Sequence, residues 1–129
     1  MTIFTKDNIT DTDFYSATPY VHDSLLKELR YEIEDNRLFL KMANDICKRI
    51  TRFNFHNVRL FHMSNTNKWG ESEEIIGISL QDSTKSDEES GVKIECDIPE
   101  GYMLFNVELF SGNYMWIMCE EIAVDEYTM

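Results

Sequence analysis

Proline and glycine are scarce in this chain: its 129 residues include two Pro and five Gly. So few turn-forming residues leave little room for flexible linkers, and this length is typical of one ordinary domain. The hydrophobic share of 43%, with eight Phe, six Tyr and two Trp, argues against disorder despite the charge. The sequence therefore predicts a single domain over residues 1–129.

Long hydrophobic runs are also lacking. No stretch approaches the roughly 18 apolar residues of a membrane-spanning helix. Residues 1–10 have neither the basic start nor the apolar run of a secretory signal. The three cysteines, Cys47, Cys96 and Cys119, are widely spaced in apolar patterns, which is typical of buried free thiols in a reducing compartment. These features predict a cytoplasmic protein without disulfides.

Motifs of catalysis and of metal binding are missing. The histidines His22, His56 and His62 have no zinc-binding spacing. If His56 and His62 share one strand, about 20 Å separates them at roughly 3.3 Å per residue. There is no nucleophile elbow and no phosphate loop, although a triad can still assemble across a fold. We therefore predict a protein that is not an enzyme and that uses no metal and no cofactor.

Positive charge is scarce in the second half of the chain. Residues 1–65 carry nine Lys/Arg and nine Asp/Glu, whereas residues 66–129 carry three Lys/Arg and fifteen Asp/Glu. The second half thus contributes 3 − 15 = −12, which is the whole formal net charge. Nucleic-acid affinity depends on Lys and Arg that neutralise phosphates, so this half is not expected to bind nucleic acid directly. An acidic field attracts basic surfaces instead.

Apolar residues recur at steps of four within residues 18–53, and such steps favour an amphipathic helix. Two registers carry the pattern: Val21, Leu25, Leu29 and Ile33, then Leu38, Met42, Ile46, Ile50 and Phe53. Thr18 and Pro19 match a helix N-cap followed by Pro at the first helical position. The sequence predicts a helix or bent helix pair over 18–53, preceded by an irregular arm or short strand at 1–17.

From residue 54 onward the apolar period changes to two, and β-branched and aromatic runs alternate with turn residues. The predicted strands lie near 55–63, 74–81, 92–98, 102–110 and 114–121, with a turn at 98–102 and a tight hairpin at 110–114. Short connections favour antiparallel neighbours. We predict an α+β fold in which the N-terminal helix or bent helix pair packs on one face of a roughly five-stranded antiparallel sheet, residues 54–129.

A small acidic chain with a leading helix and about five antiparallel strands resembles the phage inhibitors of uracil-DNA glycosylase. Other phage-encoded nucleic-acid mimics are similarly small and acidic. The resemblance is one of shape and charge, and no motif residue is matched, so no functional residue is transferred. It implies a DNA mimic that fills a nucleic-acid-binding groove.

We therefore predict a small acidic inhibitor or binding protein, of the phage anti-defence type (anti-CRISPR or anti-restriction). It would occupy a basic, nucleic-acid-binding groove of a host protein. The acids from Glu71 to Glu100 are the expected contact region, and Trp69 is the expected apolar anchor, because interface energy concentrates in a few aromatic or Arg side chains. The predicted partner-binding residues are Trp69, Glu71, Glu73, Glu74, Asp82, Asp87, Glu88, Glu89, Glu95, Asp97 and Glu100.

Other interpretations of the charge stay open. Acidic charge alone can simply keep a domain soluble. An immunity or antitoxin protein that neutralises a toxin would have the same acidic surface. A module that sequesters a small nucleotide would need aromatics and basic side chains such as Arg49, Arg52 and Arg59 in one pocket. Exposed edge strands leave room for a homodimer.

Overall fold

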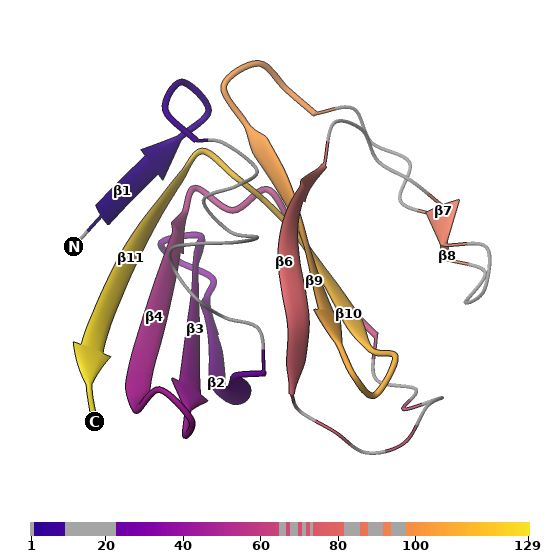
Figure 1. Cartoon of the computed structure of the whole chain (residues 1–129). Helices are drawn as coiled ribbons and strands as arrows, with labels where there is room; N and C mark the ends of the chain where they lie inside the picture. Colours follow the sequence, from indigo (N-terminus) through magenta and orange to yellow (C-terminus); the bar gives the residue numbers. More distant parts are fainter. Residues whose placement is uncertain are drawn as a thin grey trace.

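A computed structural model describes residues 2–9, 23–64, 67, 70, 72, 74–81, 86–87, 92–93 and 98–129 (Figure 1). The described part is all-β. Within these ranges there is no helix, and so none that could cross a membrane. The strands are β1 (Thr2–Thr5), β2 (Leu25–Glu32), β3 (Arg37–Asn44), β4 (Arg49–His56), β5 (Leu60–Met63), β6 (Ile75–Gln81), β7 (Ser86–Asp87), β8 (Val92–Lys93), β9 (Met103–Leu109), β10 (Tyr114–Cys119) and β11 (Glu121–Thr128).

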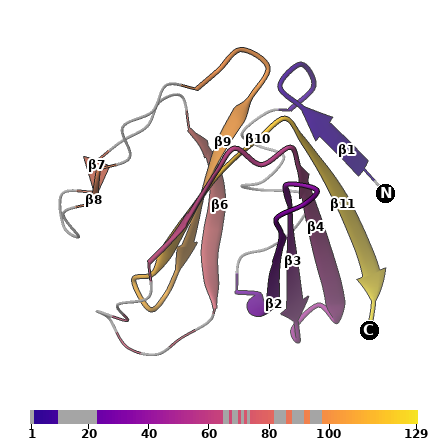
Figure 2. The same ribbon diagram turned by 180° about the vertical axis from the view of Figure 1, so that it is seen from behind.

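The strands form two antiparallel sheets that face each other, as two opposite views show (Figures 1 and 2). Sheet A has the strand order β1-β11-β4-β3-β2, and sheet B has the order β5-β10-β9-β6. Neither sheet closes on itself, and among the described strands β7 and β8 pair with each other as a separate two-stranded ribbon. The chain passes from sheet B to sheet A between β10 and β11, where Glu120 is the one residue that separates the two strands.

The predicted helix or bent helix pair over residues 18–53 is wrong. The described part of this segment forms β2, β3 and most of β4, which are antiparallel neighbours in sheet A. Steps of four are also even numbers, so they place residues on one face of a strand as well as along a helix. The predicted helix start at Thr18 and Pro19 lies outside the described residues. The resemblance to the glycosylase inhibitors depended in part on a leading helix, and that part of the resemblance is therefore wrong.

Three of the strands predicted from the period of two are confirmed. Those near 74–81, 102–110 and 114–121 correspond to β6, β9 and β10. The strand predicted over 55–63 is wrong as one element, because β4 ends at His56 and β5 begins at Leu60 in the other sheet. Of the strand predicted over 92–98, only β8 and the coil residue Ile98 are described.

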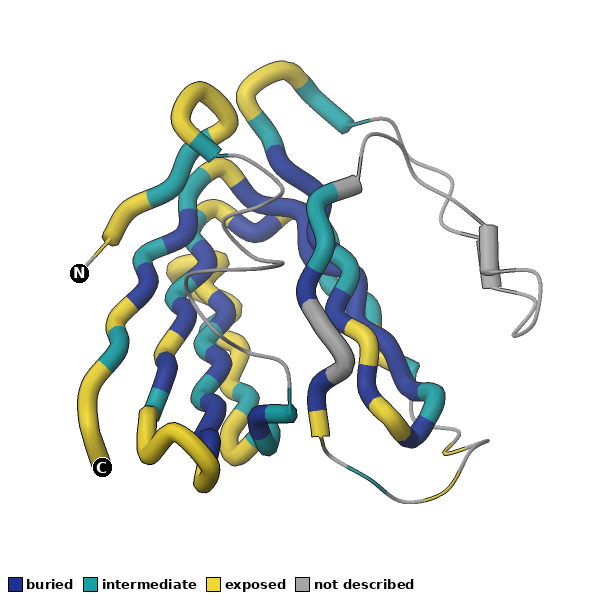
Figure 3. Tube along the Cα trace, in the orientation of Figure 1, coloured by how far each residue is buried: buried dark blue, intermediate teal, exposed yellow. Residues whose placement is uncertain are grey.

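The main hydrophobic core lies between the two sheets. Alternate residues of sheet A strands, such as Leu38, Phe53 and Phe55, are fully or almost fully buried against sheet B residues such as Phe105 and Ile117 (Figure 3). The rings of Phe53 and Phe55 stack at 6.0 Å, and Phe55 meets Phe105 edge-on at 6.1 Å. Each such side chain contributes roughly 1.5–3 kcal/mol on burial, so contact between the sheets stabilises the fold.

A second apolar cluster lies on the outer face of sheet B. Leu104, Tyr114, Trp116 and Met118 alternate with core residues along β9 and β10, yet all four are buried. Side chains of Leu60, Ile98 and Tyr102 pack against this cluster. Every residue of β10 is therefore buried, on both faces of the sheet.

The turns show why the chain reverses direction where it does. The β2–β3 and β3–β4 turns end at Asn36 and Lys48, with φ values of 51° and 57°. Gly101 has φ 84° between Pro99 and Tyr102, whose N–H donates to the Pro99 carbonyl at 3.1 Å. The φ of Gly101 and this hydrogen bond match the turn predicted at 98–102, since glycine adopts positive φ without steric cost. The predicted hairpin at 110–114 is also confirmed, between β9 and β10.

Candidate functional site

Most of the predicted partner-binding residues lie outside the described residues. Only Glu74 and Glu100 have described side chains, and both are exposed. The backbone of Asp87 lies in β7. The other predicted partner-binding residues lie outside the described residues: Trp69, Glu71, Glu73, Asp82, Glu88, Glu89, Glu95 and Asp97. Their role in binding stays a prediction.

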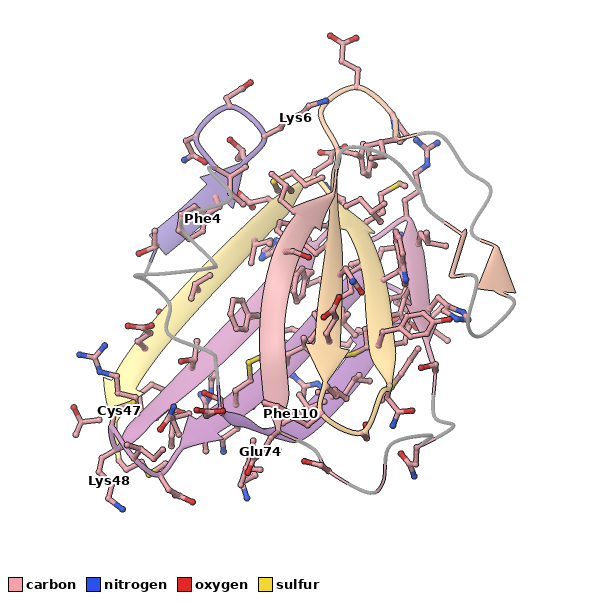
Figure 4. The ribbon with its side chains drawn as sticks, turned by 45° about the vertical axis from the view of Figure 1, so that its right-hand side comes forward. Phe4, Lys6, Cys47, Lys48, Glu74 and Phe110 are labelled. Atoms are coloured by element: carbon pink, nitrogen blue, oxygen red, sulfur yellow. The ribbon has the colours of Figure 1, made fainter. Side chains whose placement is uncertain are left out.

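The structure places Glu74 and Glu100 at opposite ends of sheet B. Glu74 immediately precedes β6, and its carbonyl accepts a hydrogen bond from the Phe110 N–H at 2.9 Å (Figure 4). Glu100 lies in the turn before β9. Because β6 and β9 are antiparallel, with Ile75 opposite Leu109, the start of β6 lies at the end of β9. A partner that touched both carboxylates would have to span about 20 Å of strand.

The charges of the described strands divide between the two sheets. Sheet A strands carry six Lys/Arg and five Asp/Glu, so their sum is 6 − 5 = +1. Among the strands of sheet B, Glu108 is the one Asp, Glu, Lys or Arg residue. Residues 66–100 carry three Lys/Arg and ten Asp/Glu, which gives 3 − 10 = −7. The acidic surplus therefore belongs mainly to the connections between strands of sheet B.

Each of the three acids of β11 lies near a basic side chain of β4. The Glu126 carboxylate lies 3.5 Å from Arg49 Nη1, and the Glu121 carboxylate lies 3.7 Å from His56 Nδ1. Asp125 is directly opposite Arg52 in the register of β11 and β4. The strands of sheet A therefore carry interleaved charges of both signs, which do not resemble a row of phosphates.

A hollow of about 380 Å³ lies on the outer face of sheet A, which turns away from sheet B. Two rows of side chains cross β2, β3, β4 and β11 there in register. The first row is Arg30, Phe39, Asn54 and Ala123. The small side chain of Ala123 leaves space between longer neighbours. The second row is Glu28, Lys41, Arg52 and Asp125.

The second row has the order acid, base, base, acid. Lys41 of β3 and Arg52 of β4 are direct cross-strand neighbours, and like charges in that position destabilise a sheet. Lys41 is half-buried, whereas Arg52 is exposed. Within the described part of the chain, Lys41 makes no ion pair or hydrogen bond. We name the side chains of the two rows the sheet A groove.

Aromatic rings hold the two arginines of the groove in place. The guanidinium carbon of Arg30 lies 4.5 Å from the centroid of the Phe39 ring, and that of Arg52 lies 5.1 Å from the Tyr127 ring. Such cation–π contacts contribute about 0.5–1 kcal/mol at exposed sites. Arg30 also lies 3.7 Å from the Glu32 carboxylate, in an exposed pair that contributes little. These contacts favour one position for each arginine of the groove.

The three arginines proposed for a nucleotide pocket do not come together. Arg52 lines the sheet A groove, whereas Arg49 pairs with Glu126 on the other side of β4. Arg59 lies 5.4 Å from the Tyr102 ring, next to the outer cluster of sheet B. Sequence reasoning missed Arg30, Phe39 and Lys41, because a strand reading of residues 25–56 is needed to place them beside Arg52.

Tyr102 and Glu120 form a polar contact at the end of sheet B. Partial burial raises the pKa of the Tyr102 phenol, and a hydrogen bond with Glu120 raises it further, while Arg59 opposes the shift. Glu120 also accepts a hydrogen bond from Asn57 Nδ2 at 3.3 Å. This contact ties the β4–β5 connection to the residue at which the chain changes sheets.

The cysteines and histidines form no site within the described ranges. Cys119 is buried in the core, and its burial raises the pKa of its thiol. Cys47 is exposed in the β3–β4 turn, so its expected burial is wrong, and Cys96 lies outside the description. His56 and His62 belong to different sheets and not to one strand. No group of three or more His, Cys, Asp or Glu in the described part could hold a metal ion.

Comparison of the chain with protein families, with curated proteins and with solved structures found no match.

Proposed function

We propose that this protein is a small acidic binding protein without enzymatic activity, which inhibits a basic, nucleic-acid-binding protein by occupying its groove. A phage anti-defence protein that acts in the cytoplasm of its host would have this character. The observation that supports the proposal is the placement of the acidic surplus. Residues 66–100 contribute −7, whereas the strands of sheet A sum to +1.

The physical mechanism is electrostatic capture. Complementary fields can raise association rates to about 10⁸ M⁻¹s⁻¹ or more at low salt, from a neutral value near 10⁵–10⁶. Salt then slows association, because the Debye length falls to about 8 Å at physiological ionic strength. The connections of sheet B carry the charge that this mechanism needs, so they are the proposed contact region, with Trp69 as an apolar anchor.

The test is displacement of a fluorescent DNA duplex from a panel of DNA-binding nucleases and nucleoid proteins, followed by anisotropy. The first variant carries Asp87→Lys, Glu88→Lys and Glu89→Lys. The matched control carries Glu34→Lys, Asp35→Lys and Asp45→Lys, which makes the same charge change in two exposed turns of sheet A. We expect the natural protein to displace DNA from at least one panel member. The first variant should associate more slowly, with a weaker dependence on salt.

The control variant should behave like the natural protein at physiological salt. Equal loss in both variants would mean that net charge alone acts and that no acidic region is recognised. If the first variant displaced DNA as well as the natural protein does, residues 87–89 would not belong to the contact. Failure to displace DNA from any panel member would contradict the proposed class of partner.

A further inference from the structure

We propose that the sheet A groove binds a nucleoside monophosphate or a closely similar small phosphate ester. The phosphate would lie between Lys41 and Arg52, and the base would lie against Arg30 and Phe39. This site is separate from the acidic connections of sheet B, so the inference goes beyond the proposed function.

The central pair of cations is the first argument. The register places Lys41 directly opposite Arg52, with Cβ atoms typically about 4.5–5.5 Å apart at such positions. No ion pair in the described residues neutralises either side chain. An anion between the two side chains would convert their repulsion into two attractions. Phosphate oxygens accept charge-assisted hydrogen bonds from both kinds of donor.

The flanking acids select among anions. Glu28 and Asp125 occupy the two ends of the row, so a bare polyanion would meet a carboxylate on either side. A ligand that carries one phosphate together with hydroxyl or amino donors reduces this repulsion, since a donor can reach the Glu28 carboxylate. A ribose and a base supply such donors, whereas a triphosphate or a nucleic-acid backbone does not balance its charge in the same way.

The first row supplies a surface for a planar ring. The guanidinium group of Arg30 lies over the Phe39 ring at 4.5 Å, and bases stack on aromatic side chains and on guanidinium planes. Asn54 stands beside Phe39 in the register, and its buried Oδ1 atom has no hydrogen-bond partner among the described residues. Buried polar atoms without partners are rare, and the amide would gain a partner if it turned toward a bound base.

The dimensions of the groove agree with a ligand of this class. Its volume of about 380 Å³ falls within the 300–1,000 Å³ range of small-molecule sites. The net charge of −12 would repel an anion at long range. Screening restricts that repulsion at physiological salt to roughly 8 Å, so the charged groups that line the groove decide the affinity.

The test is isothermal titration calorimetry of the full chain with adenosine monophosphate, adenosine and inorganic phosphate at physiological salt. We expect adenosine monophosphate to bind at least about tenfold more tightly than either fragment, because each end of the groove contributes. The groove variant carries Lys41→Gln and Arg52→Gln. It should bind adenosine monophosphate about 10–100-fold more weakly, since a hydrogen bond to a charged group contributes roughly 1.5–3 kcal/mol.

The matched control carries Lys27→Gln and Arg37→Gln, which removes two cations of β2 and β3 that do not line the groove. It should keep the natural affinity. Equal weakening in both variants, or binding of inorganic phosphate as tight as that of adenosine monophosphate, would overturn the proposal. Absence of binding by the natural chain at millimolar nucleotide would overturn it as well.

A second variant protects the test against a folding defect. Phe39→Leu keeps an apolar side chain beside Arg30 while it removes the ring. It should weaken the binding of adenosine monophosphate more than the binding of inorganic phosphate. Unfolding midpoints in urea should show that each variant is folded. The groove variant should still displace DNA in the assay for the proposed function. The two proposals can therefore fail separately.

Discussion

Lys41 and Arg52 lie directly opposite each other on β3 and β4, on the face of sheet A that turns away from the core. Each has an acid as its other cross-strand neighbour, Glu28 for Lys41 and Asp125 for Arg52. Like charges in direct opposition reduce the stability of a sheet by about 0.2–1 kcal/mol. The arrangement is thus less stable without a ligand than an alternating one would be.

A double-mutant cycle on Lys41→Gln and Arg52→Gln measures that repulsion. Each single change relieves it, so the double variant should be less stable than the summed single effects imply, by about 0.2–1 kcal/mol. Urea unfolding gives the free energies. The difference should shrink in 1 M salt, where the Debye length is about 3 Å. A cycle on Glu28 and Lys41 should give the opposite sign, and equal signs would contradict the register.

The contact between the sheets depends on Phe55, which is fully buried between Phe53 and Phe105. Phe55→Ala should lower the free energy of unfolding by about 3–5 kcal/mol, because it removes apolar contact and leaves a cavity. The control Ile33→Ala should change it by less than about 0.5 kcal/mol, since Ile33 is 80% exposed in a turn. Similar losses in both variants would argue against a core between the sheets.

Lys48 lies in the β3–β4 turn (Figure 4). Its φ of 57° belongs to the left-handed region, which residues with a side chain rarely adopt. Lys48→Gly should raise the free energy of unfolding by about 0.5 kcal/mol. This net gain is the backbone strain that glycine relieves minus the extra entropy that glycine gives the unfolded chain. Asp45→Gly in the same turn should lower it, because Asp45 has no positive φ. Thermal melting distinguishes the two, and destabilisation by Lys48→Gly would contradict the turn geometry.

The two described cysteines should differ in reactivity. In a Cys96→Ser background, a thiol reagent at pH 8 should label Cys47, which is exposed, and spare Cys119 until the protein unfolds. Peptide mapping identifies the labelled residue. Rapid labelling of Cys119 in the native protein would show that β10 is not buried.

The same thiol links stability to pH. The pKa of Cys119 is raised by burial above its ordinary value of 9.0, so the unfolded chain ionises first. The stabilisation is fully present below about pH 9 and is lost as the pH rises from there toward the folded pKa. Cys119→Ala should therefore lose less stability than the natural chain between pH 9 and pH 10.5, although it is less stable at pH 7.

Three strands of sheet B, β6, β9 and β10, could be found from the sequence because their signals are unambiguous. Residues 102–110 and 114–121 are β-branched and aromatic runs, and the hairpin between them contains Gly112, whose φ is 85°. Gly101 marks the preceding turn in the same way. The missing lysine and arginine in these strands also follow directly from the sequence.

Sheet A could not be found by the same reasoning, because its turns lack glycine and proline. Asn36 and Lys48 supply the positive φ that reverses the chain, and lysine gives no such signal in a sequence. The apolar pattern itself was ambiguous. Leu38, Leu40 and Met42 alternate as in a strand, but Leu38, Met42 and Ile46 also step by four, and Ile46 is in fact 83% exposed in a turn.

The groove was beyond sequence reasoning for a related reason. Arg30, Lys41 and Arg52 are spaced by eleven residues. On a helix this spacing would place them on one face but about 16 Å apart, at 1.5 Å per residue, and on one strand it would place successive members on opposite faces. Only the pairing of β2 with β3 and of β3 with β4 brings them together. The acids proposed as a binding surface were chosen by charge alone, and two of them, Glu74 and Glu100, lie at opposite ends of sheet B.

A nuclear Overhauser experiment on isotope-labelled protein tests this register most directly. Backbone protons of Lys41 and Arg52 should give cross-strand contacts, and Phe39 should give them to Asn54. Contacts between protons three residues apart, repeated through residues 25–53, would show a helix instead. That result would remove sheet A, the groove and the nucleotide site together.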